Sequence, residues 1–282
     1  MTTRKGENIT RWRNQRKVTT TQFFAAHPVF SLDEANQALR PASGRTAAVQ
    51  RLKHHLASGR LKLITRGVYA VVPPGSAAGK FEPDTFLVAQ TARPDAVFSH
   101  HAALELLGVA YSEWTTCTAF SAGRRRTIKM ARASIGFLQH PTPMVAHPLF
   151  GTRRVERQGR LLVATGPERT LVESFRRPAL AGGLGELLES ARAFPVLDLD
   201  LLAEMLRRYD LSILWASTGW FLEKHSRTFH VSGQVLASFE SHRPKSPQYI
   251  ARSLRGGTLL PRWNLIVPEP LLGRGEPDDT GA

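Results

Sequence analysis

The chain has 282 residues, 42% of them hydrophobic and 22% charged, with a formal net charge of +15. This length is enough for one to three domains with packed cores, and two domains are expected. Its one cysteine, Cys117, excludes an intrachain disulfide, and the longest run without charged side chains, residues 133–152, contains three prolines, which excludes a membrane helix. Because no apolar run begins the chain, a soluble cytoplasmic protein without a secretory signal is expected.

The positive charge is concentrated at one end of the chain. Residues 1–80 hold 14 Lys and Arg against 3 Asp and Glu, an excess of +11. Residues 81–282 hold 24 against 20, an excess of +4. A charge excess within one small domain indicates a polyanionic partner.

The chain begins with a basic segment, residues 1–17, that shows little periodicity. One interpretation is a disordered tail. The other is an arm that becomes ordered on DNA and reaches phosphates or a minor groove. The basic side chains of this arm are Arg11, Arg13, Arg16 and Lys17.

Two short helices are predicted next. Residues 22–26 follow two threonines and form a first helix, which ends before Pro28 because the residue before proline disfavours helix. Ser31 and Glu34 have the spacing of a capping box, and they open a second helix that continues to Leu39.

A third helix and a hairpin follow. Ser43 is a credible N-cap for a helix over Gly44–Ser58, and Gly59 suits the left-handed residue that ends it. Residues 61–64 and 68–72 then read as two strands joined by a tight turn. Three helices and a hairpin within residues 18–73 predict a winged helix-turn-helix domain.

The third helix has the polar face that a DNA-reading helix needs. Arg, Thr and Gln can reach base edges in a major groove, Lys and His can contact the backbone, and a basic turn can contact the adjacent groove. The alternative is an ordinary solvated basic face. The DNA contacts expected here are Arg45, Thr46 and Gln50 to bases, and Lys53, His54 and Arg66 to the backbone.

Residues 74–80 read as a Pro- and Gly-rich linker, residues 81–272 as a second domain, and residues 273–282 as a disordered tail. The second domain is predicted to begin as a mixed α/β layer and to continue as helices. Its predicted helices start at Asp84, at Ser99 as a cap, at Pro167, at Gly182 and Gly183, at Asp198, at Ile213 and at Val235; its predicted strands are 96–98, 115–120, 135–139, 160–163 and 259–267.

Catalytic chemistry is not expected. His101 and Glu105 are four residues apart on a predicted helix, but no third metal ligand follows at a convincing spacing, and no base is evident near Cys117. Phosphate-binding glycine loops are absent. A nuclease would need a magnesium site with an ExK pair, and Glu223-Lys224 lacks that spacing. No enzyme, cofactor or metal is therefore predicted.

Two charged motifs have two interpretations each. Glu168-Arg169 either forms an internal ion pair at a helix start or exposes Arg169 to a partner, and the internal pair is favoured. Residues 124–126, three consecutive arginines, are either a solvated turn or a second contact with a polyanion.

Four segments resemble the AbiEi-type antitoxin family, the antitoxin half of type IV toxin–antitoxin pairs whose toxin is a nucleotidyltransferase. They are HPVFSLDEA, GRLKLITRGVYAVVP, RPDAVFSHHAALELLGV and TGPERTLVESFRRPALAGG, which occur in the family's order within residues 20–185. The basic segment before Val18 is longer than the family pattern.

The resemblance implies an α+β protein: an N-terminal winged helix-turn-helix that represses its own operon, followed by a C-terminal domain that neutralises the toxin. The partners implied are double-stranded operator DNA and a nucleotidyltransferase toxin that acts on RNA. Neutralisation of the toxin does not require a stable complex with it. The preferred oligomeric state is a monomer that binds repeated half-sites of the DNA. The alternatives are a plain winged-helix transcription factor without a toxin, and a nuclease with a winged-helix targeting domain.

Overall fold

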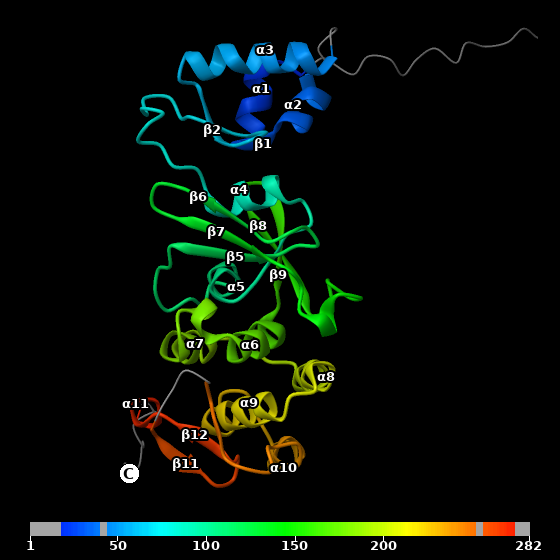
Figure 1. Cartoon of the computed structure of the whole chain (residues 1–282), viewed down its shortest axis with the longest axis vertical. Helices are drawn as coiled ribbons and strands as arrows, with labels where there is room; N and C mark the ends of the chain where they lie inside the picture. The colour runs from blue at the N-terminus through cyan, green and yellow to red at the C-terminus, as the bar shows by residue number, and fades with distance from the viewer. Residues whose placement is uncertain (1–17, 40–43, 252–255, 274–282) are drawn as a thin grey trace, which may run out of the picture. The chain divides into compact units, whose positions relative to one another are not determined.

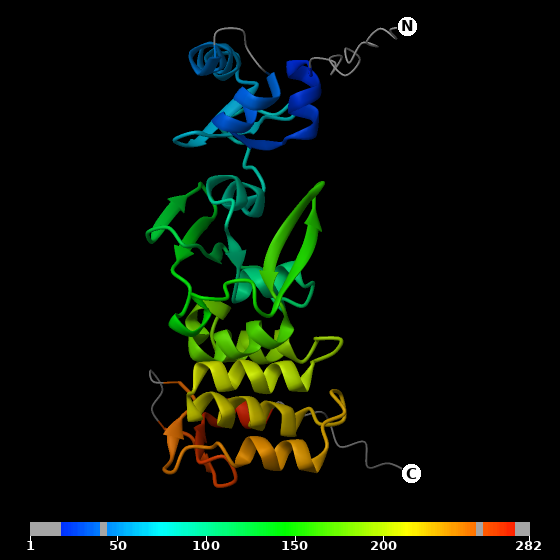
Figure 2. The same cartoon turned by 90° about the vertical axis from the view of Figure 1, so that its right-hand side faces the viewer.

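The computed structural model describes residues 18–39, 44–251 and 256–273 (Figures 1 and 2). Helices and several β-sheets alternate along this part of the chain, as expected for an α+β protein. The chain divides into two compact units, with the boundary between Ala92 and Arg93. Among the described residues, no helix combines the length and the apolar character needed to cross a membrane.

The first unit packs helices against a small antiparallel sheet. The strand order is β1-β3-β2. The elements in chain order are α1 (Thr20–Ala26), β1 (Val29–Ser31), α2 (Leu32–Leu39), α3 (Gly44–Ala57), β2 (Leu61–Thr65), β3 (Val68–Val71) and α4 (Thr85–Ala92).

Capping boxes open the first two helices. The backbone N–H of Gln22 donates to the Thr19 hydroxyl, and the Gln22 side chain accepts from the Thr19 backbone, so α1 starts earlier than predicted. The Ser31–Glu34 box is confirmed, with Glu34 N–H donating to Ser31 Oγ at 3.1 Å and Ser31 N–H donating to Glu34 Oε2 at 2.6 Å. The predicted cap at Ser43 lies outside the described residues.

Aromatic side chains form the core of this unit. Phe23 and Phe24 of α1 meet Phe30 of β1 with ring centroids 5.0 and 5.6 Å apart, and Phe30 stacks on Tyr69 of β3 at 5.7 Å. Leu52 of α3 is buried against the same cluster. This packing fixes one face of α3 and leaves the opposite face exposed.

The sheet includes a strand that the sequence did not reveal. Residues 29–31 were not predicted as a strand, and as β1 they pair with β3. The predicted hairpin is confirmed, with Gly59 and Gly67 at φ values of +72° and +80°. Beyond the predicted linker, Lys62 Nζ donates to the carbonyl of Phe81, and the first unit continues through α4.

The second unit begins with a six-stranded mixed sheet in the order β6-β7-β5-β4-β9-β8. The two outermost strands, β6 and β8, carry several charged residues and were not predicted as strands. The strands are β4 (Val97–Phe98), β5 (Thr116–Phe120), β6 (Arg126–Lys129), β7 (Ser134–Leu138), β8 (Thr152–Arg157) and β9 (Arg160–Thr165).

Helices make up most of the remaining chain, and Figure 2 shows several of them as successive layers below the sheet in the second unit. They are α5 (His101–Leu106), α6 (Pro167–Arg176), α7 (Leu184–Ala191), α8 (Leu199–Tyr209), α9 (Ser212–Lys224), α10 (Gly233–Glu240) and α11 (Glu269–Leu272), with the 3-10 turns η1 (Thr142–Met144) and η2 (Pro178–Ala181). A small sheet closes the unit, formed by β10 (Gln248–Tyr249), β11 (Thr258–Leu260) and β12 (Leu265–Val267).

Two predictions in this unit are wrong in detail. Ser99 does not cap α5: its hydroxyl contacts His100 Nδ1 at 2.9 Å, while His100 occupies the N-cap with φ +55°. The single closing strand predicted over residues 259–267 is instead the hairpin β11–β12, because Asn264 adopts φ +47° and reverses the chain. The hairpin packs closely against α9, where the indole of Trp263 lies against the Cα of Gly219.

Candidate nucleic-acid interface

The outer face of α3 carries polar and basic side chains that are open to solvent. Thr46, Gln50, Lys53 and His54 are all exposed, and their spacing places them along one side of the helix. Leu52 is 1% exposed on the opposite side, where it anchors α3 to the aromatic core. The arrangement holds the polar face in a fixed orientation, with long side chains free to reach a ligand.

The turn of the β2–β3 hairpin adds a basic side chain to this unit. Arg66 is exposed and directly precedes Gly67, whose positive φ allows the tight turn. Figure 1 shows α3 and β2 within the same compact unit, with α3 leading directly into the hairpin. Arg60, which leads into β2, is also exposed.

His55 behaves differently from its neighbour. His54 is exposed, whereas His55 is half-buried, with its ring 5.1 Å from that of Phe24. Burial lowers the pKa of His55, and the nearby charges of Arg60, His54 and Arg51 lower it further. His55 therefore belongs to the core side of α3.

Several predicted DNA contacts lie outside the described part of the chain. These are the side chain of Arg45 and the arm residues Arg11, Arg13, Arg16 and Lys17. Their assignment to DNA stays a prediction from the sequence.

The Glu168-Arg169 motif is internal, but the pairing differs from the prediction. Arg169 is fully buried, so it presents no surface to a partner. Its guanidinium binds Glu173 Oε1 at 3.0 Å rather than Glu168, whose carboxylate accepts from the backbone N–H of Asp198 at 2.9 Å. Burial raises the pKa of Glu173, and the Arg169 charge acts against that increase.

The residues considered for a metal site do not converge. His101 Nε2 lies 3.2 Å from Glu186 Oε1, whereas Glu105 is exposed and lies 3.7 Å from Arg157. No group of three metal-ligating side chains is present among the described residues. The arginines of residues 124–126 are exposed, and both interpretations of that turn remain predictions.

The structure brings together three polar side chains that the sequence did not connect. Asp95 precedes β4, Ser121 follows β5 and His140 follows β7, and all three line one cleft of about 730 Å³. No motif links them, because their proximity arises only when β5 pairs with both β4 and β7.

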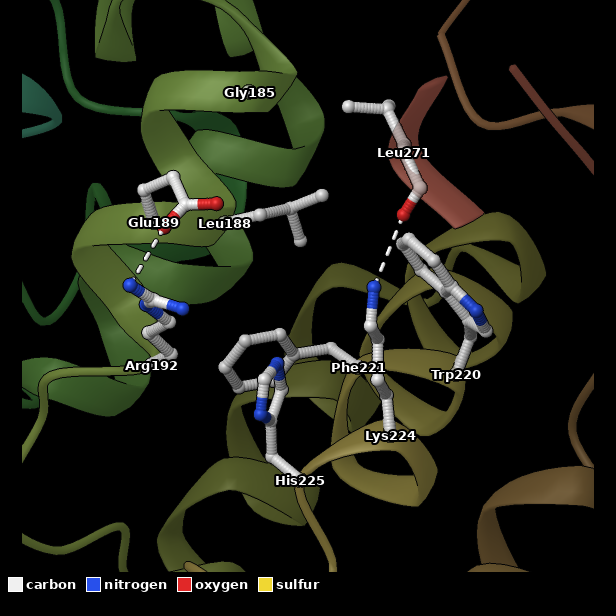
Figure 3. Close-up of a pocket in the computed structure, with 9 residues that line it drawn as sticks. All are labelled: Gly185, Leu188, Glu189, Arg192, Trp220, Phe221, Lys224, His225 and Leu271. Atoms are coloured by element: carbon white, nitrogen blue, oxygen red, sulfur yellow. Dashed lines mark hydrogen bonds and ion pairs between the residues drawn. The ribbon is translucent and has the colours of Figure 1, made fainter. Parts of the chain in front are cut away.

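A much smaller cavity, about 10 Å³, lies between α7 and α9 (Figure 3). Lys224 Nζ points into it but donates to the carbonyl of Leu271 at 3.0 Å. Burial lowers the pKa of Lys224, and the charges of Glu189 and Arg192 act in opposite directions. The space is no larger than one water molecule requires, so this amine is a structural donor.

Comparison with known proteins gives the fold and no activity. No protein-family model matches the chain, and no curated protein matches it. A crystal structure of the RV2827C protein from Mycobacterium tuberculosis is similar in fold, with a TM-score of 0.57 and 19% sequence identity over 84% of this chain and 85% of that one. A likeness at this identity concerns the path of the backbone alone.

Proposed function

We propose that this chain is a DNA-binding transcriptional autorepressor that also acts as the antitoxin of a nucleotidyltransferase toxin. The N-terminal unit is the proposed winged helix-turn-helix, with α3 as the helix that enters a major groove. The observation that carries the proposal is the exposed face of α3, where Thr46 and Gln50 lie beside Lys53 and His54.

The chemistry of this face suits a duplex. Gln50 can pair with the two hydrogen-bonding groups of an adenine edge, and Thr46 can contact either a base edge or a thymine methyl group. Lys53 and Arg66 supply positive charge for phosphates, which fixes the position of the helix without selecting a sequence. The excess of +11 over residues 1–80 favours a polyanion over a neutral partner.

The antitoxin role comes from the family resemblance and concerns the second unit. The two resembling segments there, residues 93–109 and 165–183, cover β4, α5 and α6, which are largely buried. These segments therefore bear on the architecture of the second unit more than on a contact surface. A direct toxin contact is not required by the proposal.

The test of DNA binding is a salt titration with the full chain. The probes are duplex DNA from upstream of its own gene and a scrambled duplex of equal length. Lys53→Ala is expected to weaken both complexes alike and to reduce the slope of log K against log salt by about 0.9. Gln50→Ala is expected to cost about 1–3 kcal/mol on the upstream DNA alone.

The matched control is Lys245→Ala, which removes the same charge from an exposed position in the second unit. Equal effects of Lys53→Ala and Lys245→Ala would contradict the assignment of α3 as the DNA-binding helix. Equal losses on both duplexes for Gln50→Ala would remove its base-reading role.

The antitoxin role has a separate test. Co-expression with a nucleotidyltransferase encoded next to this gene is expected to restore growth, and a repression-defective Lys53→Ala chain is expected to protect as well as the unchanged chain. Failure to protect, or absence of such a gene, would leave a plain transcription factor as the function. Magnesium-dependent cleavage of plasmid DNA by the purified chain would instead favour the nuclease.

A further inference from the structure

The second unit contains an open cleft that is independent of α3. It lies beside the sheet, where the start of β4 meets the ends of β5 and β7 and the segment around η1. Its volume of about 730 Å³ falls within the range of roughly 300–1,000 Å³ typical of small-molecule sites. All of its lining residues belong to the second unit.

Apolar side chains form most of the cleft wall. Val97 of β4 and Val163 of β9 are paired neighbours in the sheet and provide one part of the wall. Val145 and Leu149 provide another, and their side chains are 63% and 61% exposed. Exposed aliphatic side chains beside a hollow mark a surface that gains from covering by an apolar group.

One end of the cleft holds a carboxylate in a fixed position. The Ser121 hydroxyl lies 3.0 Å from each carboxylate oxygen of Asp95, and the backbone N–H of Ala122 donates to Asp95 Oδ2 at 2.8 Å. Asp95 remains solvent-exposed despite these contacts. An ionised carboxylate has about four acceptor positions, so it retains capacity for a donor from a ligand.

A histidine also lines this cleft, but its unpaired ring nitrogen is covered by the protein. The Nδ1 atom of His140 is buried and has no hydrogen-bond partner among the described residues. Burial lowers the pKa of His140, the Arg169 charge lowers it further, and Asp95 acts in the opposite direction. This direction favours the uncharged imidazole, so His140 does not add a positive charge to the cleft.

These features select one chemical class of ligand. The cleft presents the exposed carboxylate of Asp95. A phosphate or carboxylate ligand would meet Asp95 with like charge, and the lining has no Lys or Arg side chain to compensate. An ammonium group supplies three donors and a positive charge, and the aliphatic wall accepts a hydrocarbon body.

We propose that this cleft is a binding site for a low-molecular-weight amine with an apolar body, whose ammonium group contacts the exposed carboxylate of Asp95. Val97, Val163 and Leu149 then cover the hydrocarbon part. The site is separate from the proposed DNA contacts, and either assignment can fail without the other.

The test uses the full chain and three probes of equal size: phenethylamine, 2-phenylethanol and phenylacetate. Binding is measured by NMR titration in salt of about 150 mM, where long-range fields are screened beyond roughly 8 Å. Phenethylamine is expected to bind about tenfold more tightly than the alcohol, and the acid more weakly still. The side-chain carboxyl ¹³C signal of Asp95 is expected to shift with the amine.

Asp95→Asn is expected to abolish the preference for the amine, while Asp210→Asn, the same substitution at an exposed residue of the helical part, leaves it unchanged. Leu149→Lys, at a residue that is already 61% exposed, is expected to weaken phenethylamine binding by placing an ammonium group in the cleft. Equal binding of the three probes would overturn the proposal. It would also be overturned if Asp95→Asn kept the full preference for the amine and Leu149→Lys kept the full affinity for phenethylamine.

Discussion

Replacement of Arg169 by Met tests how the second unit is held together. The guanidinium is fully buried and makes three polar contacts: Glu173 Oε1 at 3.0 Å, the carbonyl of Pro148 at 2.7 Å and the carbonyl of Phe150 at 2.8 Å. Met fills much of the same space but leaves the buried Glu173 carboxylate and both carbonyls without these donors. A buried pair that loses one partner costs about 3–5 kcal/mol.

The control for this variant is Arg192→Met. Arg192 lies 3.0 Å from Glu189, three residues earlier on α7, but its side chain is 54% exposed. Exposed pairs of this kind contribute about 0–1 kcal/mol. The difference between the two variants therefore isolates the effect of burial from the loss of an arginine.

Tryptophan fluorescence during urea unfolding measures the free energy of unfolding of the second unit. Trp114, Trp215, Trp220 and Trp263 all belong to it, and the remaining tryptophan, Trp12, does not. The double variant Arg169→Met/Glu173→Met is expected to recover most of the loss, because neither charge is then buried. A loss no larger than that of Arg192→Met, or no recovery in the double variant, would refute this reasoning.

The pH dependence of Arg169→Met has a defined sign. Burial raises the pKa of Glu173 in the folded state, so the folded chain holds this proton more tightly than the unfolded chain does. The stability associated with the proton is present at low pH and is lost as the pH rises through the folded-state pKa. The deficit of the variant is therefore expected to shrink on acidification.

Three further predictions concern packing, acid stability and the hairpin turn. Gly219→Ala places a methyl group against the indole of Trp263 and is expected to cost about 1–3 kcal/mol in urea unfolding, whereas no loss would show that the indole moves freely. Burial, aided by neighbouring arginine charges, lowers the pKa of His100 to about 3. The free energy of unfolding is therefore expected to fall on acidification, by up to about 1.4 kcal/mol per pH unit between the ordinary histidine pKa and about 3. His100→Asn should flatten this pH profile, and an unchanged slope in the variant would contradict the assignment to His100. Gly67→Ala, at φ +80°, is expected to cost about 1–2 kcal/mol in the first unit by circular dichroism, in contrast to a neutral Gly79→Ala.

Local patterns in the sequence were sufficient for much of the first unit. The Ser31–Glu34 capping box and the turn at Gly67 depend on residues a few positions apart, so the sequence alone locates them. Strand β1 was missed because residues 29–31 are too few to show a period, and only their pairing with β3 makes them a strand. The strand β8 was missed because four of its six residues are charged, as is possible at a sheet edge.

The two candidate sites also differ in whether the sequence alone could locate them. The polar face of α3 follows from helical spacing, so Gln50 and Lys53 could be chosen from the sequence as exposed residues. The cleft around Asp95, Ser121 and His140 could not, because strand pairing brings together residues that are far apart in the chain. The partner of Arg169 was also misjudged, since Glu168 is its neighbour in sequence but faces the start of α8.

The contacts of Arg169 also bear on the order in which the second unit folds. Its carbonyl partners are 21 and 19 residues earlier in the chain, and the β8–β9 hairpin lies between them and α6. Closing a loop of this length has an entropic cost that precedes any gain from the contact. The guanidinium reaches its position only when α6 has formed, so we expect the segment around Pro148 to dock after the helix and to be among the first parts of the sheet layer to detach during unfolding.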